Sequence, residues 1–269
     1  MARKSQKKTA AADARGAAEH RYRAPALEKG LEILELLSGQ REPLTMAAIS
    51  ERLGRSTSEI FRMLQVLEQK GYIEKAPSGD GYRITNRLFT LGMAQPRVQT
   101  LVETALPVMR RLANAIGQSC HLAVPSSDQI VVIARIEAAG ELGFSVRTGY
   151  RRSMARATSG IVLFAFQPRE VQRQWLELLK PCEPADVLDR LAGTAVDVRK
   201  QGYGRFDSDF VRGVTDLSAP ILSGDHAVAA LTVPFVESRP LEHPIDEALP
   251  LLREAAADIS NTMTFGDHP

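Results

Sequence analysis

Residues 50–73 read SERLGRSTSEIFRMLQVLEQKGYI, and this stretch decides the fold of the first part of the chain. It predicts a helix that has Ser56 as its N-cap residue, Glu59 as the partner of a capping box, and Gly71 as its end. A plain surface helix needs one cap residue, so the run of hydroxyl residues between two arginines requires a further explanation. The apolar positions of the helix recur at the spacing of one buried face: Ile60, Met63, Leu64 and Leu67.

The segments around this helix complete the pattern of a small domain. Residues 25–38 have apolar positions at helical spacing before Gly39, and a short helix is predicted between Thr45 and Gly54. The segment YIEKAPSGDGYRIT that follows gives two alternating runs around a turn, which predicts a hairpin. Helix, helix, tight turn, helix and hairpin is the order of a winged helix-turn-helix, which we assign to residues 25–85.

The winged helix-turn-helix explains the hydroxyl residues, because a recognition helix presents its first turns to DNA. Hydroxyls and free N–H groups at a helix start bind phosphates, and an arginine such as Arg62 binds guanine with two hydrogen bonds. Basic residues of the hairpin are expected to contact phosphates. The alternative is an ordinary capped surface helix with solvated charges. The predicted DNA contacts are Arg55, Ser56, Thr57, Ser58, Phe61, Arg62, Gln65, Lys75, Arg83 and Arg87.

The composition of the 269 residues is typical of a globular protein, with 44% apolar and 25% charged residues. We expect no membrane contact and a cytoplasmic location, because the chain has neither a bilayer-spanning apolar run nor a signal-peptide pattern. Residues 1–100 carry 17 basic and 11 acidic residues, whereas residues 101–269 carry 17 and 21. A basic front favours nucleic-acid binding. Residues 1–24 are expected to be a disordered basic arm that either follows phosphates or only aids solubility.

Together with segments of the second half, these motifs resemble the isocitrate lyase regulator (IclR) family of transcription factors. The resemblance runs in the family's order from about residue 24 to residue 262. It implies a winged helix-turn-helix, a linker helix that contributes to dimerisation, and a C-terminal effector-binding domain related to the GAF fold, in dimers or tetramers. The matching segments are ALEKGLEILELL, LTMAAISERLGRSTSEIFRMLQVLEQKGYI, GYRIT with LFTLG, ARATSGIVLFA, KQGYGRFDSDFVRGVTDLSAPI and AVAALTV.

The second half is expected to be an α+β domain over residues 101–269 with an antiparallel sheet and flanking helices. A linker helix precedes it over residues 86–100, with its helical part near Arg87 to Met93. Pro96 and Pro107 interrupt the helical spacing, which predicts two helical pieces after the linker. The predicted strands are CHLAV, IVVIARI, LGFSVRTG, LSAPIL and AVAALTVPF. Two helices are predicted near 158–179, another near 185–201 and a final one near 244–263.

We expect this half to be no enzyme and to hold no cofactor or metal. The patterns H-E-x-x-H, G-x-S-x-G and Walker A are absent, and the five histidines have no ligand spacing. Cys120 and Cys182 lack the C-x-x-C spacing of zinc sites and are expected to be buried thiols. Cys120 and His121 are a poor nucleophile and base, because neighbours in a strand point to opposite faces.

The resemblance places an effector pocket between the sheet and the helix that follows the TSG turn. Thr158 and Ser159 can cap this helix, whose free N–H groups would favour a carboxylate. The residues that match or adjoin the family's effector contacts are Met154, Thr158, Ser159, Gly160, Asp216, Ser218 and Thr232, and the predicted effector site also includes Cys120 and Phe144.

The sequence departs from the family's pocket at Asp216, where many members have a cysteine, and at Ile161, where lysine is common. The Asp216 side chain would repel a small carboxylate ligand unless Asp216 is protonated or paired with a cation. Phe144, Met154 and Phe235 would suit a larger ring, so an aromatic or hydroaromatic acid is favoured as the effector.

The sequence thus predicts a ligand-responsive transcriptional regulator of a catabolic operon that senses a small organic acid. Its partners would be further copies of itself and double-stranded DNA with a pseudo-palindromic operator. Two alternatives remain: a helix-turn-helix protein with an enzymatic or metal-sensing C-terminal domain, and a protein-interaction module that does not bind DNA.

Overall fold

The computed structural model describes residues 24–266, apart from residue 78 and the segments 94–95, 139–142 and 238–243. The chain divides between residues 95 and 96 into two compact units, each with a core of its own. All but the last residue of the predicted basic arm, residues 1–24, lies outside the described residues.

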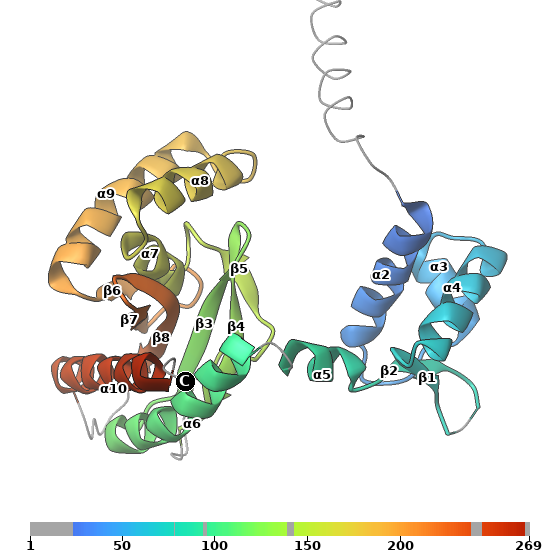
Figure 1. Cartoon of the computed structure of the whole chain (residues 1–269), viewed down its shortest axis with the longest axis horizontal. Coiled ribbons are helices and arrows are strands. Elements are labelled where there is room, and N and C mark those ends of the chain that lie inside the picture. Colours follow the sequence, from blue (N-terminus) through green and yellow to red (C-terminus); the bar gives the residue numbers. More distant parts are fainter. Residues whose placement is uncertain (1–23, 78, 94–95, 139–142, 238–243, 267–269) are drawn as a thin grey trace, which may run out of the picture. The chain divides into compact units, whose positions relative to one another are not determined.

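The first unit is a bundle of short helices with a hairpin (Figure 1). The hairpin strands are antiparallel, with Glu74 opposite Arg83, and Leu44 forms an isolated bridge to Tyr82. This is the predicted order of a winged helix-turn-helix. Its elements are α2 (Pro25–Ser38), α3 (Met46–Leu53), α4 (Thr57–Gln69), β1 (Ile73–Lys75), β2 (Tyr82–Ile84) and α5 (Arg87–Met93).

The inner faces of three helices hold the first unit together. Ile33 of α2, Ile49 of α3 and Ile60 of α4 are fully buried in one apolar cluster. The turn from α3 to α4 is sharp because Gly54 has a φ of 60°, a left-handed conformation that costs glycine little. The burial of one face and this tight turn leave the other face of α4 exposed.

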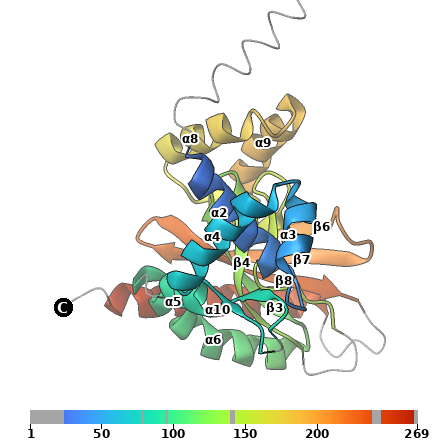
Figure 2. The same cartoon turned by 90° about the vertical axis from the view of Figure 1, so that its right-hand side faces the viewer.

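The second unit is a six-stranded antiparallel sheet with helices on both faces, and its strand order is β5-β4-β3-β8-β7-β6. Helices α6 and α10 cover one face, and α7, backed by α9, covers the other. Figures 1 and 2 show α8 and α9 on the side away from α6 and α10. The elements are α6 (Pro96–Ile116), β3 (Cys120–Ser126), β4 (Gln129–Ile136), β5 (Arg151–Ser153), α7 (Thr158–Ala165), α8 (Arg169–Leu179), α9 (Ala185–Gln201), β6 (Gly204–Asp207), β7 (Val214–Ser223), β8 (His226–Val236) and α10 (Ile245–Gly266).

Several details of the second unit correct the sequence analysis. Residues 143–149 form no strand; the chain turns there, with Gly149 at a φ of 81°, and the edge strand β5 begins only at Arg151. Pro107 does not break the helix, because its exposed ring puts the missing hydrogen bond on the solvent side of a continuous α6. Cys182 is an exposed thiol rather than a buried one.

The linker helix expected near Arg87 to Met93 is α5, whereas the end of the predicted linker segment, residues 86–100, belongs to another helix. Helix α5 ends at Met93, and α6 begins at Pro96 and belongs to the second unit. Strand β6, which the sequence analysis did not predict, forms the other edge of the sheet.

Candidate DNA-binding surface and effector cavity

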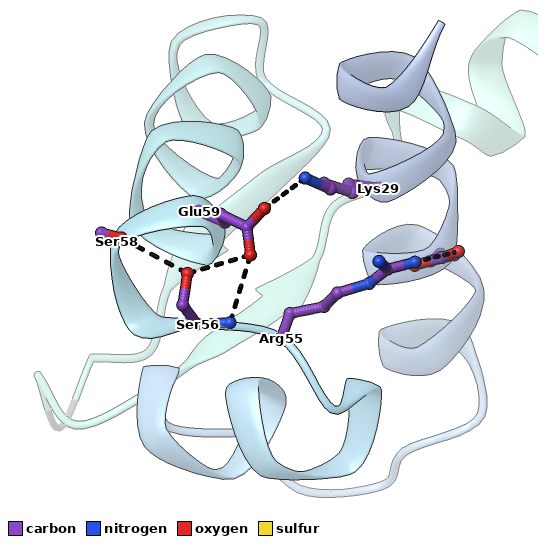
Figure 3. A network of polar contacts seen from close by, with 6 residues as sticks. Lys29, Arg55, Ser56, Ser58 and Glu59 are labelled. Carbon is purple, nitrogen blue, oxygen red and sulfur yellow. Dashed lines mark hydrogen bonds and ion pairs between the residues drawn. The ribbon is translucent and has the colours of Figure 1, made fainter. Parts of the chain in front are cut away.

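The tip of α4 is fixed by a polar network centred on Glu59 (Figure 3). The backbone N–H of Ser56 donates to the Glu59 carboxylate at 3.3 Å, and the Ser56 hydroxyl donates to it at 2.9 Å, within the predicted capping box. Lys29 of α2 pairs with the same carboxylate. The hydrogen bonds from Lys29 and then Ser56 lower the pKa of Glu59 to about 2. Glu59 therefore stays ionised at neutral pH and holds the start of α4 against α2.

The outer face of α4 carries the side chains predicted to contact DNA. Arg62 is exposed and has no ion pair or hydrogen bond to a described residue, so its five donors are free for a ligand. The Ser56 and Ser58 hydroxyls lie 3.3 Å apart at the tip. The exposed residues of this face are Ser56, Thr57, Ser58, Phe61, Arg62 and Gln65.

Arg55 differs from this set because it is held within the domain. Its guanidinium donates to both carboxylate oxygens of Glu32 of α2, at 3.2 and 3.3 Å. Arg55 lies at the turn before α4, and its side chain extends toward α2, as Figure 3 shows. This arrangement gives Arg55 a role in joining α2 to the helix-turn-helix.

The basic residues of the hairpin and of α5 are in three different environments. Arg83 pairs with Glu74 across the hairpin at 2.7 Å, so its charge is largely compensated. Arg87 lies over the ring of Tyr72, with 5.4 Å to the ring centroid. Lys75 is exposed and has no ion pair within the described part of the chain. Lys75 is thus the more available phosphate contact of the two hairpin cations.

In the second unit, a cavity of about 310 Å³ lies between the sheet and the start of α7. Its walls are the segment 144–147, strand β5, the loop 208–210 and the α7 start, and its floor is β3, β7 and β8. The rings of Tyr150 and Phe210 lie 6.1 Å apart at one wall. A cavity of this size can hold one small organic molecule.

A row of polar side chains crosses the floor of the sheet. His121 of β3 is opposite Thr232 of β8, which is opposite Ser218 of β7. The hydroxyls of Ser218 and Thr232 are 2.8 Å apart and share a hydrogen bond. His121 is 6% exposed, and burial lowers its pKa to about 4, so it is neutral at physiological pH.

Asp216 is the acidic group of the cavity. Burial raises its pKa to about 6, against the opposing effects of Arg152 and of a 3.5 Å hydrogen bond from the Thr158 hydroxyl. The expectation that Thr158 and Ser159 cap α7 is wrong, because the N-cap residue is Ala157 and no side chain makes a cap hydrogen bond. The start of α7 is buried against the cavity, and the Thr158 hydroxyl bonds to Asp216 instead.

Three arginines bring positive charge to the cavity. Arg152 pairs with Asp209 and lies over the Phe210 ring, 5.4 Å from its centroid. Arg156 pairs with the buried carboxylate of Glu183 at 2.8 Å. Arg147 is exposed at the cavity and has no ion pair to a described residue.

The structure brings five of the nine predicted effector residues to the cavity: Phe144, Thr158, Ser159, Asp216 and Thr232. Ser218 lies beneath the cavity, hydrogen-bonded to Thr232. Met154 and Gly160 pack against each other, and a Cβ atom at Gly160 would come within 2.2 Å of the Met154 carbonyl oxygen.

Cys120 does not line the cavity and faces the opposite core. Its thiol donates to the Met109 carbonyl oxygen at 3.5 Å, and burial raises its pKa to about 12. Phe235, which the sequence analysis placed beside the effector, is buried in the same core under α6 and α10. Within the described residues, no group of three or more His, Cys, Asp and Glu side chains could hold a metal ion.

Comparison with known protein families identifies both units. Residues 95–261 match the family described as bacterial transcriptional regulator IclR C-terminal, and residues 26–77 match the IclR helix-turn-helix domain. The chain belongs to the IclR family of transcriptional regulators. In the described part of this IclR-family chain, no helix has the length and apolar character needed to cross a membrane.

Relatives from bacteria match along nearly the whole length. The HTH-type transcriptional regulator KdgR of Escherichia coli K12 is 28% identical over 242 residues, which cover 88% of this chain and 92% of KdgR. The HTH-type transcriptional repressor AllR of the same strain is 25% identical over 251 residues, covering 91% of this chain and 93% of AllR. These relatives are transcriptional regulators.

Solved IclR structures have the same fold. An IclR homolog from Microbacterium hydrocarbonoxydans, in complex with 4-hydroxybenzoate, superposes with a TM-score of 0.74 at 22% identity and covers 90% of this chain and 100% of its own. The Thermotoga maritima IclR gives a TM-score of 0.67 at 24% identity, covering 88% and 98%.

Four residues at the cavity of this IclR-family protein were not predicted from the sequence: His121, Arg147, Arg152 and Phe210. For His121 a signal was present, because strand alternation puts it on the face opposite Cys120. The other three lie on a turn, an edge strand and a loop, whose positions no local pattern fixes.

Proposed function

We propose that this IclR-family protein is a DNA-binding transcriptional regulator whose activity responds to a small organic acid. The exposed outer face of α4, in a chain of this family, is the observation that carries the proposal. The Arg62 guanidinium would bind a guanine, and the Ser56, Thr57 and Ser58 hydroxyls would bind phosphates. Phe61 and Gln65 would contact the bases and sugars beside them.

The hairpin and the start of α5 would hold the neighbouring phosphates. Lys75 would contribute the freest charge, and Arg83 and Arg87 would contribute less because Glu74 and Tyr72 already engage them. Arg55 would act through its ion pair with Glu32. In a homodimer or homotetramer, two copies of α4 would face a pseudo-palindromic operator in double-stranded DNA.

The effector would occupy the 310 Å³ cavity of the GAF-like domain and change the spacing of two recognition helices by shifting the population of dimer geometries. The size and the aromatic wall of the cavity support a one-ring organic acid, as does the 4-hydroxybenzoate bound to the Microbacterium homolog. Such an acid suggests control of a catabolic operon. The Phe144, Thr158, Ser159, Asp216 and Thr232 side chains would line the bound acid.

We propose no enzymatic step, cofactor or metal for this protein. The Cys120 thiol stays protonated at neutral pH and faces away from the cavity, so a nucleophilic role has no support. Because the target would be chromosomal DNA, the protein would act in the cytoplasm.

The experiment that tests this function is selection of genomic DNA fragments by the purified full chain, followed by footprinting of the fragments that it retains. The Arg62→Ala variant should lose base preference, whereas the control Arg173→Ala, on the exposed side of α8, should retain it. Retention of no specific fragment by the wild-type chain would contradict the proposal.

A further inference from the structure

The cavity beside α7 contains polar groups that the folded chain leaves unsatisfied. The Nδ1 atom of His121 has no hydrogen-bond partner among the described residues, and neither has the Nε atom of Arg152, although both atoms are buried. Within the described part of the chain, the side chain of Asp216 has only the long hydrogen bond from Thr158. Unsatisfied buried polar groups are costly, so a ligand that completes them binds with a large gain.

The charges that line the cavity favour a ligand with one negative charge. Of the three arginines that line it, Arg152 pairs with Asp209 and Arg156 pairs with Glu183. Arg147 has no ion pair to a described residue, and His121 is neutral. The available positive charge is therefore that of Arg147, and a carboxylate can pair with it.

The same residues fix the direction of such a ligand. A carboxylate is repelled by Asp216 and attracted by Arg147 and by the free Nε–H of Arg152, so it pairs with the arginines. A second polar group of the ligand is then needed to meet Asp216 and His121. A hydroxyl group there can donate to the Asp216 carboxylate and form a second hydrogen bond with His121 Nδ1.

We propose that the cavity selects hydroxy-carboxylic acids, binding the carboxylate through Arg147 and Arg152 and reading the remote hydroxyl group with Asp216 and His121. This inference rests on the proposed function, because it names the chemical class of its effector. Asp216 is the specificity-determining residue, and it discriminates between acids of equal size by the presence of a hydrogen-bond donor.

The test is calorimetric titration of the full chain with matched acids. The probes are benzoate and phenylacetate, each without a substituent, with a 4-hydroxyl group and with a 4-methoxy group. We expect the hydroxy acids to bind at least about tenfold more tightly than the unsubstituted acids, since a hydrogen bond to an ionised group is lost otherwise. The methoxy acids, which cannot donate, should have no such advantage.

Two variants separate the ends of the ligand. Asp216→Asn should reduce the hydroxyl preference to less than about threefold, because a strong acceptor is lost. Arg147→Gln should weaken all the acids by a similar factor and leave the preference intact. Asp189→Asn, on the exposed side of α9, is the matched control and should behave as wild type.

Three results would overturn the inference: an Asp216→Asn variant that keeps the preference, equal binding of hydroxy and unsubstituted acids, or binding of none of the probes. None of these results affects DNA selection by the unliganded protein. A wild-type chain that retains specific DNA fragments but fails the titration would thus refute the ligand class alone.

Discussion

Replacing Asp216 with asparagine is expected to stabilise the second unit at neutral pH and to do so less in mild acid. The buried Asp216 carboxyl has its pKa raised to about 6 from an ordinary value of 3.8, so the folded domain disfavours the ionised form. The contribution of Asp216 to the free energy of unfolding is therefore most favourable below its unfolded pKa. This contribution falls as pH rises from the unfolded to the folded pKa, and it stays lower above the folded pKa. The other charged or titratable side chains that line this cavity are Arg147, Tyr150, Arg152, Arg156, Asp209 and neutral His121. Of these, Arg152 and Asp209 act on the pKa of Asp216.

The magnitude follows from the two pKa values. Each pKa unit corresponds to 1.36 kcal/mol, so the ionised carboxylate destabilises the folded domain by on the order of 3 kcal/mol at about pH 8. At about pH 5 the folded carboxyl is mostly protonated, and roughly half of this penalty is relieved. The advantage of Asp216→Asn should thus shrink by about 1.4 kcal/mol, or roughly 3–6 °C in melting temperature, between these pH values.

The assay is thermal unfolding of the full-length wild type and variant at one protomer concentration and both pH values. All other titrating groups are common to both proteins, so their contribution cancels in the difference. Asp189→Asn serves as the exposed control and should show no pH-dependent difference. A stability difference between wild type and Asp216→Asn that is equal at both pH values would refute the reasoning.

Three further predictions concern single side chains. Arg62→Ala should weaken operator binding by about 1–3 kcal/mol in gel shifts. It should not lower the melting temperature, because Arg62 is exposed and unpaired with any described residue. Unchanged base preference would contradict this assignment. Lys75→Gln should reduce the salt dependence of DNA binding by about one phosphate contact, and Arg83→Gln should reduce it less because Glu74 pairs with Arg83. Equal slopes of log affinity against log salt concentration for the two variants would contradict this prediction. Gly160→Ala should destabilise the second unit by about 1–3 kcal/mol or more, since its Cβ would lie 2.2 Å from the Met154 carbonyl oxygen. An unaltered melting curve would contradict this prediction and would mean that the backbone moves to accommodate the added methyl group.

The first unit could be predicted from sequence because its determinants are local. The capping box joins Ser56 to a residue three positions later, and Gly54 marks the turn before α4. The ion pair of Arg55 could not be predicted in this way. Its partner Glu32 lies 23 residues earlier, and only the packing of α2 against α4 brings the two together.

The residues that line the cavity could be predicted only in part, because the set depends on which face of the sheet each side chain lies on. Cys120 and His121 are neighbours on opposite faces, and the strand pairing sets which of them joins Thr232. The start of α7 near residue 158 was predicted, but the capping role of Thr158 and Ser159 was wrong, since the TSG pattern alone does not show that Thr158 bonds to Asp216. Residues on the turn and loop around the cavity had no periodicity to reveal them.

The pKa of Asp216 couples ligand binding to proton binding. A hydroxyl that donates to the ionised carboxylate lowers the pKa of Asp216, so binding a hydroxy acid at about pH 6 should release up to roughly half a proton. An unsubstituted ring over the same carboxyl removes water without giving a hydrogen bond, which raises the pKa and causes proton uptake. Binding enthalpies measured in two buffers of different ionisation enthalpy give the sign. The Asp216→Asn variant should abolish both effects, because it lacks the carboxyl group that exchanges the proton. Proton exchange that persists in this variant would come from another group and would contradict the assignment.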